Sequence, residues 1–151
     1  MDFRSFRMAD GFVAKASIED RLAIEDLFVR YAAALDEGDV EGVVGCFTED
    51  GWLDSPIVGR HQGKASLREF AERIAESKRR GAQFRHAVSN FRIDISGDRG
   101  RGRCYLLDFA TVAGKCELLS SGEYDCELEK VDGEWLFASR IVRMDRSFSI
   151  P

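Results

Sequence analysis

The second half of the sequence constrains the fold most, because from Gln83 onward its apolar residues recur with a period of two. Stretches of this kind with strand-like composition cover Gln83–Ile95, Arg101–Val112, Cys116–Lys130 and Glu134–Met144. Short segments that contain glycine join them, at residues 96–99, 113–115 and 131–133. Connections of this length form hairpins, so the pattern predicts a long antiparallel meander.

The first half has helical rather than strand periodicity. Ser17 and Asp20 resemble a capping box, and the helix that they open extends to about Glu37, where Gly38 stops it. Asp39 is placed to cap a short second helix through residues 46–47, and a turn is expected at 48–51, followed by a short extended piece at 52–55. A third helix begins at 64 or 66 and ends near residue 81.

Helices followed by a long antiparallel sheet predict the α+β class, with the helices on one face of the sheet. A strongly twisted sheet that curls around helices leaves a cone-shaped cavity between the two layers. Nine apolar or aromatic residues at the inward spacing of these elements are expected to form the core: Leu27, Phe28, Leu35, Phe47, Phe70, Ile74, Tyr124, Leu128 and Trp135.

Composition excludes several classes of protein. The 151 residues carry a net charge of −5 with no basic run beyond residues 78–80, which makes nucleic acid an unexpected partner. No apolar stretch approaches the ~18 residues of a membrane span. The four cysteines form no C-x-x-C pair, and the two histidines have no zinc-binding spacing, so neither a metal nor another cofactor is expected. Residues 1–16 have no signal-like apolar run, so we expect a loosely ordered arm before a single domain of residues 17–151, in a cytoplasmic protein.

Two residues stand out as a candidate acid–base pair. Asp36 ends a nearly apolar helix and shares its side with Val29 and Ala32, where a buried carboxylate needs a partner. His86 lies on the first long strand and shares a face with Val88 and Asn90. Farther along that strand the apolar residues change parity. A bulge near residues 89–91 would reconcile the two halves, and bulges are frequent next to active sites.

Asp108 interrupts an apolar strand, so its carboxylate either pairs with a cation or faces a pocket. Three arginines on or after the last strand are candidate partners, namely Arg140, Arg143 and Arg146. Arg143 shares its parity with Trp135 and Phe137, which would direct it toward the pocket. The alternative is that at least two of the three are exposed arginines at the edge of the sheet.

Several of these residues fall in an order that resembles the nuclear-transport-factor-2-like (NTF2-like) superfamily. The resemblance rests on Ala23-Ile24-Glu25-Asp26-Leu27, Tyr31, Leu35-Asp36-x-Gly38-Asp39, Phe47-Thr48-Glu49-Asp50-Gly51, Gly59-x-x-x-Gly63, Arg85-His86-x-x-Ser89-Asn90 and Asp132-Gly133-x-Trp135. Within the superfamily, residues 17–145 are most similar to the SnoaL-like branch, which includes scytalone dehydratase, hexachlorocyclohexane dehydrochlorinase and bile acid 7α-dehydratase.

The resemblance implies a cone-shaped pocket in which His86 is the base and Asp36 orients it, with Tyr31 and Asp108 assisting. It favours a cofactor-independent lyase of the dehydratase type, or an isomerase, acting on an apolar cyclic small molecule. The expected pocket walls are Val29, Ala32, Trp52, Val88, Asn90 and Arg143. The alternatives are a small-ligand-binding protein without turnover, or a structural subunit like the β chain of ring-hydroxylating dioxygenases.

The last strand also predicts an assembly. If Trp135 and Phe137 face the pocket, then Leu136, Ala138 and Val142 face outward and leave an apolar surface on the sheet. Because exposed apolar patches usually mark interfaces, we expect a homo-oligomer, a dimer or a trimer, formed through the sheet.

Overall fold

The computed structural model describes residues 17–151, and the predicted arm at residues 1–16 lies outside them. Within these described residues, three helices and six strands follow one another. They are α1 (Ile18–Glu37), α2 (Val40–Gly45), β1 (Phe47–Ser55), β2 (Gly59–Gln62), α3 (Gly63–Arg79), β3 (Gln83–Ser96), β4 (Arg99–Val112), β5 (Lys115–Val131) and β6 (Glu134–Met144).

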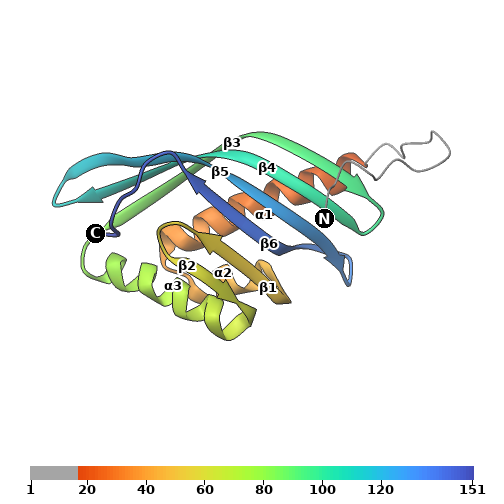
Figure 1. Cartoon of the computed structure of the whole chain (residues 1–151), viewed down its shortest axis with the longest axis horizontal. Coiled ribbons are helices and arrows are strands. Elements are labelled where there is room, and N and C mark those ends of the chain that lie inside the picture. Colours follow the sequence, from red (N-terminus) through yellow and green to blue (C-terminus); the bar gives the residue numbers. More distant parts are fainter. Residues whose placement is uncertain (1–16) are drawn as a thin grey trace.

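The six strands form one curved, mixed sheet in the order β2-β1-β6-β5-β4-β3. Figure 1 shows α1 running along the inner side of that sheet, with α3 beside the β1–β2 hairpin. Only β1 and β6 pair in parallel, so the predicted α+β class and the antiparallel meander from β3 to β6 are confirmed. The predicted turn at 48–51 is wrong, because these residues belong to β1, which has an irregular register with β6 between Phe47 and Trp52.

Both ends of α1 are fixed by specific hydrogen bonds. Ser17 Oγ accepts from the backbone N–H of Asp20 at 3.0 Å, and Gly38 ends the helix with φ +72°, a left-handed conformation that suits glycine. The Asp20 carboxylate does not complete a capping box; it accepts from Lys130 Nζ and from the Trp135 indole N–H, each at 2.8 Å. The start of α1 is therefore attached to the β5–β6 hairpin. None of the helices in residues 17–151 is long and apolar enough to cross a membrane.

The core lies between α1 and the sheet, around Phe28. This ring makes edge contacts with Phe91 and Phe137 at centroid distances of 5.5 and 5.1 Å. The sheet approaches it so closely that a Cβ atom on Gly102 would lie 2.9 Å from the Phe28 ring, which explains a glycine within β4. All nine residues expected in the core are buried, so that prediction is confirmed.

A bulge in β6 corrects the predicted strand parity. Phe137 and Ser139 pair with consecutive residues of β5, which leaves Ala138 as the extra residue. The inward-facing set therefore shifts from Trp135 and Phe137 to Arg140 and Val142. The prediction that Val142 faces outward is wrong, and so is the prediction that Arg143 faces the pocket.

The outer side of the sheet is a mixture of ion pairs and exposed apolar residues. Asp125 binds Arg101 at 2.7 Å and Arg143 at 3.2 Å. The exposed apolar side chains of this sheet are Tyr105, Leu107, Val112, Leu118, Val131 and Ile141. This surface differs from the one foreseen, and a homo-oligomer formed through it stays a prediction. Light scattering at micromolar concentration is expected to give the mass of a dimer or trimer; a monomer mass would contradict it.

Replacement of Phe28 by alanine should remove the centre of the core. Because the surrounding rings are held by both layers, we expect the free energy of unfolding to fall by ~3–5 kcal/mol. Chemical denaturation measures this change. Val29→Ala, at the next position of α1 but half exposed, is the matched control and should change stability by less than ~0.5 kcal/mol. Equal losses in the two variants would contradict this description of the core.

Candidate active site

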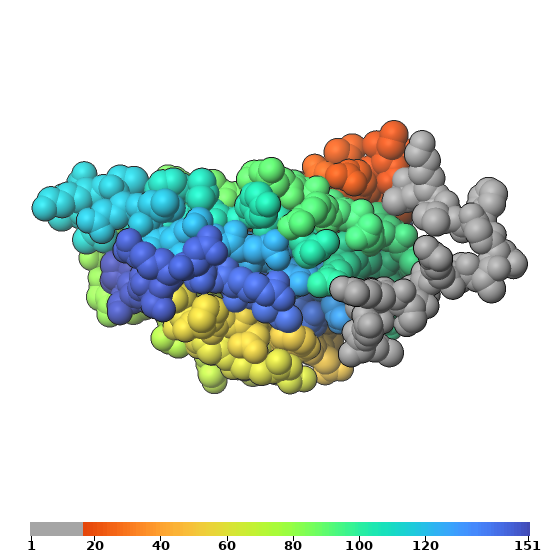
Figure 2. Space-filling view, turned by 45° about the horizontal axis from the view of Figure 1, so that its top comes forward, coloured from red at the N-terminus to blue at the C-terminus, as the bar shows by residue number. Residues whose placement is uncertain are grey.

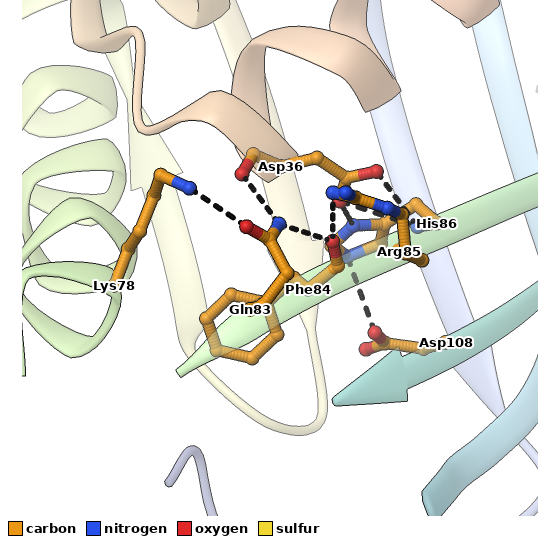
Figure 3. Close-up of polar contacts among 7 residues, drawn as sticks. All are labelled: Asp36, Lys78, Gln83, Phe84, Arg85, His86 and Asp108. Atoms are coloured by element: carbon orange, nitrogen blue, oxygen red, sulfur yellow. Dashed lines mark hydrogen bonds and ion pairs between the residues drawn. The ribbon is translucent and has the colours of Figure 1, made fainter. Parts of the chain in front are cut away.

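The carboxylate of Asp36, in the last turn of α1, binds the start of β3 at three points. Its Oδ1 lies 2.6 Å from His86 Nδ1, and its two oxygens accept from the backbone N–H of His86 at 3.2 and 3.1 Å. Figure 3 shows Gln83 beside this contact, with its amide donating to the Asp36 carbonyl and accepting from Lys78. The predicted contact between Asp36 and His86 is therefore present, and the hydrogen bonds around it connect α1, α3 and β3.

This contact fixes the orientation of the imidazole. An ionised carboxylate only accepts hydrogen bonds, so the neutral ring carries its proton on Nδ1 and has a free lone pair on Nε2. His86 Nε2 lies 3.5 Å from Oδ1 of Asp108, across the β3–β4 pair. The side chains of Asp36, His86 and Asp108 are only 13, 9 and 6% exposed, so their interactions are little screened by bulk water. The three residues form a buried row with His86 in the middle.

Asp108 is the unusual member of the row. Its Oδ1 has no hydrogen-bond partner among the described residues. Burial raises the pKa of this carboxyl group, His86 lowers it, and the charge of Asp36 raises it further, with a net rise. A carboxylic acid that keeps its proton beside a histidine can serve as a proton donor.

A cavity adjoins the row on the inner side of the sheet. Its volume is about 60 Å³, well below the roughly 150 Å³ of a cavity that holds benzene. Apolar side chains make most of its wall, and the polar groups come from Tyr31, Ser55, His86, Asp108 and Tyr124. The apolar lining comes from Leu35, Leu53, Ile57, Val58, Phe70, Ile74, Phe84, Val142, Met144, Phe148 and Ile150.

The segment after β6 forms one side of this cavity. Phe148 and Ile150 are partly buried against the core, and the carbonyl of Pro151 accepts from the hydroxyl of Ser77 on α3. Figure 2 shows this dark-blue segment beside the yellow residues of the β1–β2 region, where Ile57 and Val58 belong to the same wall. The cavity is thus lined by residues from distant parts of the chain.

The structure gathers some of the predicted site residues and separates others. His86, Asp108 and Tyr31 line the cavity, and Asp36 lies behind His86. The predicted pocket walls are wrong, since none of those six residues lines it: Val29, Ala32, Trp52, Val88, Asn90 and Arg143.

Four of these residues lie outside the cavity for different reasons. Ala32 is buried elsewhere, whereas Val29 lies on the outer side of α1 and is half exposed. Trp52 stacks under the guanidinium of Arg60, 3.9 Å from the ring centroid. Asn90 is the bulged residue of β3, with φ 57°, and its side chain points away from the core. The predicted bulge near residues 89–91 is confirmed, but it turns Asn90 outward.

Sequence reasoning missed two residues of this region. Tyr124 was expected in the core, but it lines the cavity as well. Arg140 was only one of three candidate arginines, and it is completely buried behind the cavity wall. The one signal for Arg140 in the sequence is its charge within an apolar strand. The bulge at Ala138, which turns Arg140 inward, has no signal in the sequence.

Comparison with known proteins agrees with this architecture. Residues 16–141 match the family described as a SnoaL-like domain. Rv3472 of Mycobacterium tuberculosis, of unknown function, is 33% identical over 87% of this chain and 79% of its own, with a TM-score of 0.78. A protein of unknown function with a cystatin-like fold, from Nostoc punctiforme, is 25% identical over 89% of this chain and 97% of its own, with a TM-score of 0.76. A protein from Catenulispora acidiphila, solved in complex with S-DNPA, is 25% identical over 85% of this chain and 96% of its own, also with a TM-score of 0.76.

The raised pKa of Asp108 predicts a pH-dependent gain in stability for Asp108→Asn. The folded protein binds this proton more tightly than the unfolded chain, so wild-type stability falls as the pH rises from the ordinary aspartate pKa through the folded value. The variant lacks this loss, and its stability relative to the wild type should increase with pH over that interval. Chemical denaturation at a series of pH values measures the difference. Asp50→Asn, at an exposed position, should give a flat difference, and a flat difference for Asp108→Asn would contradict the assignment.

Proposed function

Since this chain belongs to the SnoaL-like domain family, we propose that it is a cofactor-independent lyase of the dehydratase type, or an isomerase, for an apolar cyclic small molecule. The observation that carries the proposal is the Asp36–His86 contact of 2.6 Å, which leaves the other imidazole nitrogen beside Asp108 at the cavity. Apolar lining on most of the wall favours a substrate with a hydrocarbon ring.

The elimination would begin at the free nitrogen of His86. Nε2 takes a proton from a carbon next to a carbonyl group, and the Asp36 carboxylate stabilises the imidazolium that forms. The electron pair of the broken C–H bond first moves onto the carbonyl oxygen, which gives an enolate. The carbonyl then re-forms, and the electron pair becomes the new C=C bond as the C–O bond to the leaving hydroxyl breaks. Asp108 donates its proton to that hydroxyl, which leaves as water, and the proton on His86 later restores Asp108.

The size of the cavity adds a requirement. A ring-sized substrate needs more room than about 60 Å³, so part of the wall has to move when it binds. Four partly buried residues of that wall lie outside any helix or strand. Ile57 and Val58 lie between β1 and β2, whereas Phe148 and Ile150 follow the last strand. We propose that the segment with Phe148 and Ile150 makes room for the substrate.

A small-ligand-binding role is the second candidate, because a relative of this chain was solved in complex with S-DNPA. The two candidates differ in one property, namely whether the ligand is returned unchanged. A ligand that raises the melting temperature but is recovered intact would support binding without turnover.

Replacement of either member of the pair should abolish the reaction. A suitable probe is a bicyclic β-hydroxy ketone whose dehydration gives a fluorescent naphthol. Because general-base catalysis contributes ~10²–10⁴-fold, His86→Ala and Asp36→Asn should each lower kcat/KM by a factor in that range. Circular dichroism and the melting temperature establish that the variants are folded.

Two control variants separate the pair from its surroundings. Asp26→Asn lies on the exposed side of the same helix, and His61→Ala removes the other histidine, which is bonded to Ser66 and the Val58 carbonyl. Both should retain the wild-type rate. A folded His86→Ala protein with wild-type turnover would leave the proposed mechanism without its base.

A further inference from the structure

Arg140 is the most unusual residue outside the Asp36–His86–Asp108 row. It lies on β6, is completely buried, and its guanidinium is surrounded by aromatic rings. Its Nε donates to Sγ of Cys126 at 3.3 Å, but its two terminal nitrogens have no hydrogen-bond partner in residues 17–151. The distances from the guanidinium carbon to the ring centroids are 3.8 Å for Tyr31, 4.1 Å for Tyr124, 4.1 Å for Phe137 and 5.2 Å for Phe28.

The charge of Arg140 has no matching anion nearby. None of the ion pairs within the described residues involves Arg140, whose electrostatic partners are Cys126, Tyr31 and Tyr124. Burial raises the pKa of the Cys126 thiol, which therefore stays neutral. The faces of the aromatic rings stabilise a cation, but they carry no net charge. An unpaired buried charge is costly, so this part of the protein has an electrostatic preference for an anion.

Two of the four rings connect this charge to the cavity. Tyr31 and Tyr124 pack on the guanidinium and also line the cavity that holds His86 and Asp108. Burial raises the pKa of both phenols, to about 12 for Tyr31, and the charge of Arg140 opposes this rise. Both therefore remain protonated hydrogen-bond donors in front of a fixed positive charge.

We propose that Arg140, Tyr31 and Tyr124 make this wall an oxyanion subsite, which binds an enolate or phenolate oxygen in preference to the neutral form of the same ligand. Arg140 is a positioning residue in this arrangement, since the tyrosine rings separate it from the ligand. The inference rests on the proposed function for its role in catalysis. When His86 removes a proton from carbon, the negative charge passes to the carbonyl oxygen of the substrate, and this wall would stabilise it.

The sign of a pKa change tests the subsite without any turnover. The probe is para-nitrophenol, whose ionisation is followed by its absorbance, titrated with the full chain over a range of pH. Burial alone would raise the pKa of the bound phenol. We expect it to fall by about one unit instead, which means that the phenolate binds roughly tenfold more tightly than the phenol. A raised pKa, or no saturable binding of the phenolate, would overturn the proposal.

Variants then assign the preference to Arg140. Arg140→Met has a neutral side chain of similar length and should abolish the preference, whereas Arg140→Lys should keep part of it. If Arg140→Met does not fold, Tyr124→Phe provides the test, because it removes one donor from the wall and should weaken phenolate binding more than phenol binding. An unchanged preference in a folded Arg140→Met or Tyr124→Phe protein would contradict the subsite.

One further variant separates this inference from the proposed function. His86→Ala removes the base but not the oxyanion subsite, so it should keep the preference for the phenolate while any dehydration is lost. A chain that prefers phenolate but dehydrates nothing would contradict the lyase alone. A chain that dehydrates its substrate without preferring phenolate would contradict the oxyanion subsite alone.

Discussion

The Asp36 carboxylate is the interaction on which the geometry of this site depends. It accepts the backbone N–H of His86 as well as the imidazole, so one side chain fixes both the start of β3 and the ring that the strand carries. The end of α1, set by Gly38, determines where that carboxylate stands. A hydrogen bond to an ionised group contributes about 1.5–3 kcal/mol, and two donors of His86, one of them shared between both oxygens, make a strong attachment between helix and sheet in a largely buried place.

The titratable groups near the cavity differ in their charge because their local partners differ. Asp36 accepts from the backbone N–H and the imidazole of His86, whereas Asp108 has an unpartnered oxygen and a raised pKa, which favours its neutral form. Arg140 keeps its charge between aromatic rings. Acid, base and cation thus lie around one largely apolar cavity, and their local partners rather than their residue types separate their roles.

The fold was more predictable from sequence than the walls of the site. The period-two strands and the glycine turns depend on local patterns, whereas the grouping of Asp36, His86 and Asp108 was expected from the family resemblance. Each of these has its counterpart in the structure. Bulges in the sheet decide which side chains of β3 to β6 face inward. The bulge in β3 was foreseen from a change of parity, but the bulge at Ala138 of β6 lies in a run where inward and outward residues are both apolar. Without that extra residue, Arg140 and Val142 would face outward, which is the orientation predicted for Val142 from the sequence.

The two functions of Asp36, in folding and in chemistry, determine how its variants should be interpreted. Loss of the carboxylate charge weakens the bonds to the backbone of β3 as well as to the imidazole, so lost activity in an Asp36 variant has two possible causes. His86 has no such ambiguity, because alanine at that position still offers its backbone N–H to Asp36. The attachment of helix to strand persists while the base is removed. Evidence for catalysis at this site therefore has to come first from His86, and Asp36 variants then measure how much of its effect is orientation.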